Sequence, residues 1–265
     1  MLFDAGSYTL KIGDTEMDYA CFGKGDKALI MIPGLSLKRV KPFALFLAAM
    51  YRCFAEDYRV YVFDRKEEIP EGYTVKDIAD DIAYAMGVLH IEKADIFGVS
   101  QGGMVAQYLA LEHPQLVNKL VLAVTISREN ETVRSVIGHW IELTEKEDFE
   151  ALVSDMMYKM YTDGYLKKYS GLVPILARMG RPKDPNRFIR LAKACVTCDT
   201  YHRLEEITCP VFVIGGKLDK IVTGEASEEI AAKLGCEIYM YEELGHSAYE
   251  EAEDFNSRIK AFLES

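Results

Sequence analysis

The stretch Ala94–Met104 constrains the fold more than any other part of the chain. An apolar run typical of a buried strand leads directly into Gly98-x-Ser100-x-Gly102. Behind it, apolar residues recur at helical spacing until Pro114 ends the pattern. The sequence therefore predicts a strand, a sharp turn and a helix, with Ser100 at the tip of the turn.

A serine in this position suits a nucleophile. The backbone at such a tip is strained, and its flanks come so close that only glycine fits two positions before and after the serine, where Gly98 and Gly102 stand. An oxyanion beside Ser100 Oγ would face the backbone N–H of Gln101 at the positive end of the helix dipole. The motif alone also occurs by chance in glycine-rich loops, but the flanking strand and helix favour the catalytic interpretation.

The rest of the chain alternates strands and helices around this turn. The pattern predicts strands at 7–12 and 16–22, joined as a hairpin, and at 28–32, 59–63, 119–124, 211–214 and 237–241. It predicts helices at 37–54, 73–89, 225–234 and 249–263. This order indicates an α/β fold with a doubly wound, mostly parallel sheet.

Together the turn and the strand order resemble the nucleophile elbow and core of the α/β-hydrolase superfamily. Members of that superfamily insert a helical cap where this chain loses its strand pattern. The resemblance implies a core at 1–126, a helical cap at 127–206 and a return to the core at 207–265. The expected cap is rich in methionine and tyrosine, of which at least half should form its own core and the others an adaptable apolar lining: Met156, Met157, Tyr158, Met160, Tyr161, Tyr165, Tyr169 and Met179.

A nucleophilic serine needs a histidine base within reach. Only His246 lies in a loop just past a core strand, at the edge of the sheet where ligands bind in open α/β folds. The other histidines stand at helix ends or in the expected cap: His90, His113, His139 and His202. His246 is therefore the candidate base.

The base in turn needs a carboxylate to orient it. Asp219 follows a core strand after a short Gly-Gly turn, and the order Ser100, Asp219, His246 is that of α/β-hydrolases. Asp64 also ends a core strand and is the rival acid. Its neighbour Arg65 offers it a salt bridge, which favours a structural role for Asp64.

The resemblance also implies an oxyanion hole. In the superfamily its second N–H follows a His-Gly pair after an early strand, and here that pair is Pro33-Gly34. The expected backbone donors are Leu35 and Gln101. Because Pro33 has no N–H, the hydrogen bonding of this loop must differ from that of its relatives.

Composition excludes other classes of function. The net charge of −11 would repel nucleic acid, and no apolar run is long enough to cross a membrane, so we expect a cytoplasmic protein without either partner. Cys195 and Cys198, with His202 nearby, fall short of the four ligands of a structural zinc site. We expect reduced thiols, no metal and no cofactor.

The sequence thus predicts a serine hydrolase acting on a small or medium, mainly apolar ester, thioester or lactone. Nucleophilic Ser100 argues against the haloalkane dehalogenase and epoxide hydrolase branches, which use aspartate. Serine aminopeptidases, C–C bond hydrolases and perhydrolases share the triad and stay open, as does a non-catalytic protein that binds a small ligand. An aminopeptidase would need a buried acid, for which several glutamates compete: Glu131, Glu142, Glu145, Glu147 and Glu150. The sequence leaves open whether the protein is a monomer or a homodimer.

Overall fold

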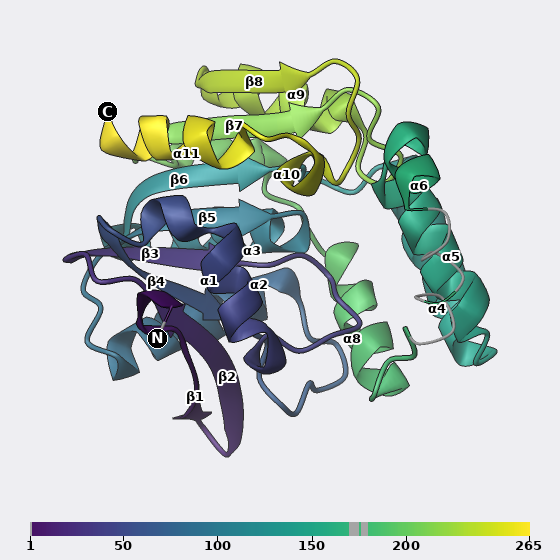
Figure 1. Cartoon of the computed structure of the whole chain (residues 1–265), viewed down its shortest axis with the longest axis horizontal. Coiled ribbons are helices and arrows are strands. Elements are labelled where there is room, and N and C mark those ends of the chain that lie inside the picture. The colour runs from purple at the N-terminus through teal and green to yellow at the C-terminus, as the bar shows by residue number, and fades with distance from the viewer. Residues whose placement is uncertain (1, 170–174, 176–179) are drawn as a thin grey trace.

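The strands form one sheet of eight, in the order β1-β2-β4-β3-β5-β6-β7-β8. The computed structural model describes residues 2–169, 175 and 180–265 (Figure 1). The strands are β1 (Gly6–Ile12), β2 (Thr15–Phe22), β3 (Lys27–Ile32), β4 (Tyr58–Phe63), β5 (Ala94–Val99), β6 (Val117–Ala123), β7 (Val211–Gly216) and β8 (Glu237–Tyr241). Only β2 pairs antiparallel, with β1 and with β4, and the other neighbours are parallel. The predicted mostly parallel sheet and its leading hairpin are confirmed.

Helices cover both faces of the sheet because side chains alternate along each strand. These helices are α1 (Ala44–Met50), α2 (Val75–Val88), α3 (Gln101–Glu112), α9 (Gly224–Leu234), α10 (Ala248–Glu251) and α11 (Phe255–Glu264). On β3, Leu29 and Met31 join the core under α1 and α11, whereas Ile30 and Ile32 join the core under α2, α3 and α9. Burial on both faces explains why the central strands read as continuous apolar runs.

Two predicted helices are broken in the structure. The helix expected at 37–54 is α1 flanked by two short 3-10 helices, Lys41–Phe43 and Arg52–Phe54. Pro42 stands in the first turn of the first 3-10 helix, where its missing N–H would have no partner within the helix. The closing helix expected at 249–263 is divided into α10 and α11 by Ala252, whose backbone is extended.

Between β6 and β7 the described part of the chain contains a 3-10 helix, Tyr201–Glu206, and four α-helices, here called the inserted helices. They are α4 (Glu131–Glu145), α5 (Phe149–Met160), α6 (Asp163–Lys168) and α8 (Pro185–Cys195). Each is preceded by a polar residue whose side chain accepts a hydrogen bond from the first turn, namely Asn130, Asp148, Thr162 and Asp184. They lie beyond the carboxyl ends of the parallel strands, at the right of Figure 1. In the part of the chain that the structure describes, no helix is long and apolar enough to cross a bilayer.

Candidate active site

Ser100 stands between β5 and α3 with an unusual backbone conformation, φ 54° and ψ −118°. A positive φ is uncommon for a residue with a side chain and persists only where the surroundings hold it. Here the N–H of Ser100 donates to the carbonyl of Ala123 (2.9 Å), and its carbonyl accepts from Thr125 Oγ1 (2.7 Å). The predicted strand, turn and helix are all present.

The two glycines of the motif are required by close contacts. A Cβ on Gly98 would lie 2.4 Å from the carbonyl oxygen of Gly102. A Cβ on Gly102 would lie only 1.8 Å from the carbonyl oxygen of Ile32. Neither space holds a methyl group, so the turn packs directly against α3 and the end of β3.

Asp219 and His246 are hydrogen-bonded in the structure. Asp219 Oδ2 lies 2.8 Å from His246 Nδ1, and both side chains are at least 95% buried. Asp219 Oδ1 accepts from the backbone N–H groups of Ile221 (2.8 Å) and Val222 (3.0 Å), which fixes the carboxylate. Because a carboxylate only accepts, Nδ1 carries the proton and Nε2 is left as the basic nitrogen.

The two loops that carry this pair are joined by their backbones. Leu218, which precedes Asp219, donates its N–H to the carbonyl of Leu244 (2.9 Å), two residues before His246. Asp219 and His246 are 27 residues apart in sequence. The backbone hydrogen bond between their loops brings them together at the edge of the sheet.

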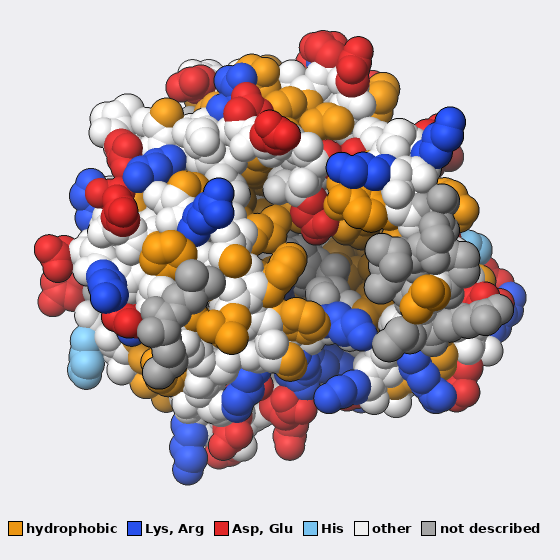
Figure 2. All heavy atoms as spheres, in the orientation of Figure 1, with side chains coloured by type: hydrophobic (Ala, Val, Ile, Leu, Met, Phe, Trp, Pro, Cys, Tyr) orange, Lys and Arg blue, Asp and Glu red, His pale blue; other side chains and the backbone are white. Residues whose placement is uncertain are grey.

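Ser100 and His246 both line one cavity, whose empty volume is about 480 Å³ with its mouth included. Its other walls are mostly apolar: Gly34, Leu35, Met104, Val133, Ile137, Trp140, Met156, Met160, Cys195, Ile221, Val222 and Tyr249. Figure 2 shows the molecule hollowed where the inserted helices meet the sheet half, with hydrophobic side chains on the wall. No lysine, arginine, aspartate or glutamate is among these described lining residues. The cavity therefore suits an uncharged, apolar group.

Leu35 and Gln101, the expected oxyanion donors, both belong to segments next to Ser100. A Cβ on Gly34 would be 3.2 Å from Ser100 Cβ, so the loop that carries Leu35 packs against the serine. Gln101 is the first residue of α3, a position whose N–H has no partner within the helix. Within the described residues, no hydrogen bond uses the N–H of Leu35 or of Gln101. Leu35 lines the cavity, whereas Gln101 is not among its described lining residues.

The sequence model of the alpha/beta hydrolase fold matches residues 27–253. The chain belongs to the alpha/beta hydrolase family. RutD of Serratia proteamaculans (strain 568), provisionally named a carbamate hydrolase, is 26% identical over 71% of this chain and 74% of its own. The 3-oxoadipate enol-lactonase 2 of Acinetobacter baylyi (strain ATCC 33305 / BD413 / ADP1) is 21% identical over 96% of both chains. The structure of MGS-M2, an alpha/beta hydrolase from a Medee basin deep-sea metagenome, has a TM-score of 0.86 at 18% identity, covering 97% of this chain and 98% of that one.

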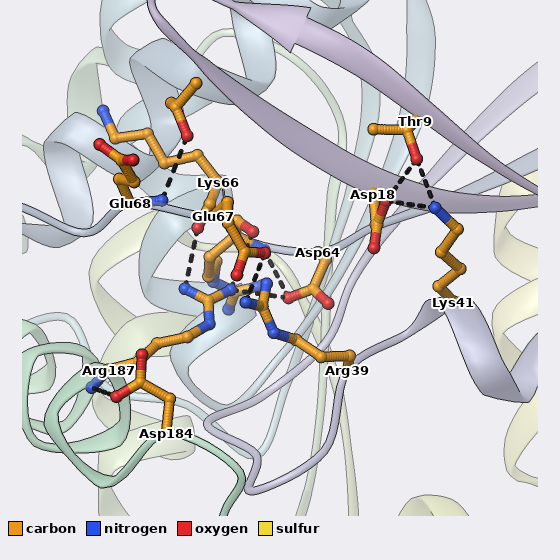
Figure 3. Close-up of polar contacts among 12 residues, drawn as sticks. Thr9, Asp18, Arg39, Lys41, Asp64, Lys66, Glu67, Glu68, Asp184 and Arg187 are labelled. Atoms are coloured by element: carbon orange, nitrogen blue, oxygen red, sulfur yellow. Dashed lines mark hydrogen bonds and ion pairs between the residues drawn. The ribbon is translucent and has the colours of Figure 1, made fainter.

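Asp64, the rival acid, is bound elsewhere in this alpha/beta hydrolase. Its carboxylate accepts from the backbone N–H groups of Val40 (2.9 Å) and Arg65 (2.7 Å). The expected salt bridge with the Arg65 side chain is wrong: the ion pair is with Arg187 of α8, at 3.2 Å (Figure 3). Asp64 thus holds together the end of β4, the loop after β3 and α8.

The sequence predicted only some of the residues of the inserted helices that line the cavity. Met156 and Met160 line the cavity as the composition suggested, whereas Tyr158 is 57% exposed and Met179 lies outside the described residues. The sequence reasoning missed the wall formed by α4, which presents Val133, Ile137 and Trp140. Their spacing of four and three residues is the signal that could have found them.

The loop of His246 is also tied to the inserted helices. Ser247, the next residue, donates its N–H to the carbonyl of Met160 at the end of α5 (2.9 Å). One turn further, Glu251 accepts from the backbone N–H of Thr162 (3.0 Å) and from its hydroxyl, and Glu250 accepts from the Tyr161 hydroxyl. These contacts, here called the α5–α10 junction, join the residues after His246 to the wall of the cavity.

Cys195 and Cys198 are expected to resist alkylation in the folded enzyme. Burial raises the pKa of the Cys195 thiol to about 12 and also raises the pKa of Cys198. Since the thiolate is the nucleophile, little of either would react below that pKa. With iodoacetamide at about pH 8, mass spectrometry should find both unmodified in the native protein and alkylated after unfolding in guanidinium. Rapid native modification of Cys195 would contradict this.

A metal clip at these cysteines finds no support in the geometry. Among the described residues, no three histidine, cysteine, aspartate or glutamate side chains are placed to hold an ion. All six cysteines are free. The absence of a cofactor stays a prediction of the sequence.

Proposed function

We propose that this alpha/beta hydrolase is a serine hydrolase that cleaves small or medium, mainly apolar carboxylic esters, thioesters or lactones. Ser100 is the nucleophile, His246 the base and Asp219 the residue that orients it, while the N–H groups of Leu35 and Gln101 form the oxyanion hole. The proposal rests on one observation: the Asp219–His246 hydrogen bond of 2.8 Å ends at the cavity that Ser100 also lines.

The first half of the reaction forms an acyl-enzyme. Ser100 Oγ attacks the carbonyl carbon as His246 Nε2 takes its proton, and the carbonyl π electrons move to oxygen. The two N–H groups then hold the oxyanion, where preorganised donors act most strongly because water is excluded. The C–O or C–S bond breaks when imidazolium His246 returns its proton to the leaving group.

Water completes the cycle. His246 removes a proton from a water molecule, which attacks the acyl carbon, and the same donors hold the second oxyanion. As this intermediate collapses, the bond between the acyl carbon and Ser100 Oγ breaks, imidazolium His246 returns its proton to Oγ, and the carboxylic acid is released. Asp219 stays ionised throughout and stabilises imidazolium His246.

The chemistry of the cavity supports the proposed substrate class. An aminopeptidase needs a carboxylate for the substrate's amine, and no described lining residue supplies one. Trp140 is held in place by a hydrogen bond from Nε1 to Asp155 (2.7 Å), which gives the acyl group a fixed apolar wall. The lactonase and carbamate hydrolase names of two relatives fit the same reaction, because both substrates present a carbonyl carbon to a nucleophile.

The proposal extends to the inserted helices. We assign residues 127–206 as a cap that closes the site, between core segments 1–126 and 207–265. The apolar faces of α4 and α5 at the cavity support this division. The cytoplasmic location stays a prediction, and the sequence leaves the oligomeric state open.

A fluorophosphonate should label the purified protein at Ser100 alone, because it reacts with a serine activated by a base. Intact mass should rise by one adduct, and the modified peptide should contain Ser100. Ser100→Ala should take no label. The matched control is Ser36→Ala, which should label normally. It removes an exposed hydroxyl that follows Leu35 and accepts from the N–H of Lys38.

A panel of 4-nitrophenyl esters would then define the acyl group. We expect the highest kcat/KM for short to medium uncharged chains and little turnover of an aminoacyl 4-nitroanilide. Absence of both labelling and ester turnover in the folded protein would overturn the proposal. Ligand binding that survives Ser100→Ala, without turnover, would instead identify a binding protein.

A further inference from the structure

A buried guanidinium lies behind the candidate oxyanion hole. Arg65, two residues after the end of β4, is 3% exposed. Its Nη2 donates to the carbonyl of Pro33 (2.6 Å) and to Gln101 Oε1 (3.0 Å). One nitrogen therefore joins the loop after β3 to the first residue of α3.

Its two acceptors belong to the two halves of the oxyanion hole. Pro33 precedes the donor Leu35 by two residues, and Gln101 is the other donor. The carbonyl of Pro33 also lies against α3, because a Cβ on Gly102 would be 2.8 Å from it. A hydrogen bond at this carbonyl fixes the plane of the peptide that leads into the donor loop.

The loop needs such an anchor because of its own sequence. Proline at position 33 has no N–H with which to hold itself to a neighbour. The Arg65 hydrogen bond supplies the contact from outside the loop, through the carbonyl of the same residue. A residue 32 positions further along the chain thus fixes the loop's geometry.

Burying the Arg65 guanidinium costs free energy, because a charged group loses its contact with water. Burial lowers the pKa of its guanidinium, with the Asp64 carboxylate opposing that effect. Its Nε is buried without a hydrogen-bond partner among the described residues. Asp64 is directed instead to Arg187 and to backbone N–H groups (Figure 3). Among the described residues, the Arg65 side chain donates only to neutral acceptors. A buried charge of this kind is expected to add little to the stability of the fold, which favours a role in the site.

The Gln101 side chain also binds one of the inserted helices. Its Nε2 donates to the carbonyl of Leu191 (2.6 Å) and to Cys195 Sγ (3.1 Å), both in α8. The Gln101 side chain is therefore held at both ends, by Arg65 and by α8. This arrangement leaves it one orientation, and its backbone N–H remains directed by the start of α3.

We propose that Arg65 is a positioning residue for the oxyanion hole, acting through Pro33 and Gln101 to hold the two N–H donors in register. The inference rests on the proposed serine hydrolase function. Arg65 is not among the described residues that line the cavity. It stabilises the geometry that the donors need when the oxyanion forms.

Replacing Arg65 by methionine should lower kcat by about 10- to 100-fold while KM changes less than about threefold, because the donors act on the transition state. The affinity for an alkyl boronic acid, which forms a tetrahedral adduct on serine, should fall by a similar factor. Arg65→Lys keeps a donor and should recover part of both losses. Arg190→Met is the matched control: Arg190 donates to the carbonyl of Ile69 (2.6 Å) on the same loop as Arg65, and its loss should leave both values unchanged.

Gln101→Met provides a second route if Arg65→Met fails to fold. It keeps the backbone N–H but removes the acceptor, so kcat and boronate affinity should again fall together. Circular dichroism and thermal unfolding check that each variant is folded. An unchanged kcat in a folded Arg65 variant, or a lower kcat with full boronate affinity, would overturn the inference. Failure of the proposed function itself is distinct, since the wild-type protein would then neither label nor turn over esters.

Discussion

Replacing His246 by alanine is expected to lower kcat for a 4-nitrophenyl ester by about 10⁵- to 10⁶-fold. In the proposed mechanism His246 takes the serine's proton in the first step and activates water in the second, so its loss removes the base from both halves of the reaction. Asp219 and the two backbone donors would remain, and they account for the residual rate. The variant should also lose fluorophosphonate labelling of Ser100.

His113→Ala is the matched control for this variant. His113 also meets a carboxylate, with Nε2 2.8 Å from Asp80, but it lies at the end of α3 and does not line the cavity. Its loss should change kcat by less than about twofold. Active-site titration must accompany the assay, since traces of wild-type enzyme would hide a large loss. A His246→Ala enzyme within about tenfold of wild type would exclude His246 as the base.

Replacing Asp219 by asparagine should lower kcat by about 10³- to 10⁴-fold. Asp219 Oδ2 accepts the His246 Nδ1 proton, while Oδ1 accepts two backbone N–H groups. An asparagine must keep its oxygen on those N–H groups and turn its NH₂ toward His246. The imidazole would then carry its proton on Nε2 and could not accept one from Ser100.

Asp64→Asn distinguishes the role of Asp64 from that of Asp219, because it should change stability rather than kcat. This change weakens a buried ion pair with Arg187, so we expect the free energy of unfolding to fall by about 1–3 kcal/mol. We expect kcat to change by less than about tenfold. Urea unfolding and steady-state kinetics on both variants give the comparison. A larger loss of kcat in Asp64→Asn than in Asp219→Asn would mean that Asp64 is the acid.

The elbow shows how far local sequence can reach. Gly98, Ser100 and Gly102 are close in the chain, and their spacing, with an apolar run before it and a helical pattern after it, predicted the turn that the structure contains. The order of strands likewise predicted the parallel sheet, because each apolar run is short and set off from the next. The roles of the site residues remain predictions until they are tested.

Contacts between distant segments could not be predicted in this way. Arg187 lies 123 residues from Asp64, and no local pattern distinguishes it from other arginines of the inserted helices. The same holds for Arg65, whose neighbour in sequence is Asp64 but whose side chain turns to Pro33 and Gln101. Pairing Asp64 with its neighbour in sequence gave the wrong ion pair. The direction that each side chain takes at the end of a strand depends on packing that the sequence does not display.

The α5–α10 junction couples access to the cavity with the geometry of His246. Met160 both lines the cavity and accepts the N–H of Ser247, so an outward movement of the end of α5 must break a hydrogen bond next to the base or carry that loop with it. An enzyme opened on this side would hold its histidine less firmly than a closed one. If substrate enters on this side, turnover would be confined to the closed form. An acyl group on Ser100 would then be shielded from other nucleophiles until the end of α5 moved outward again.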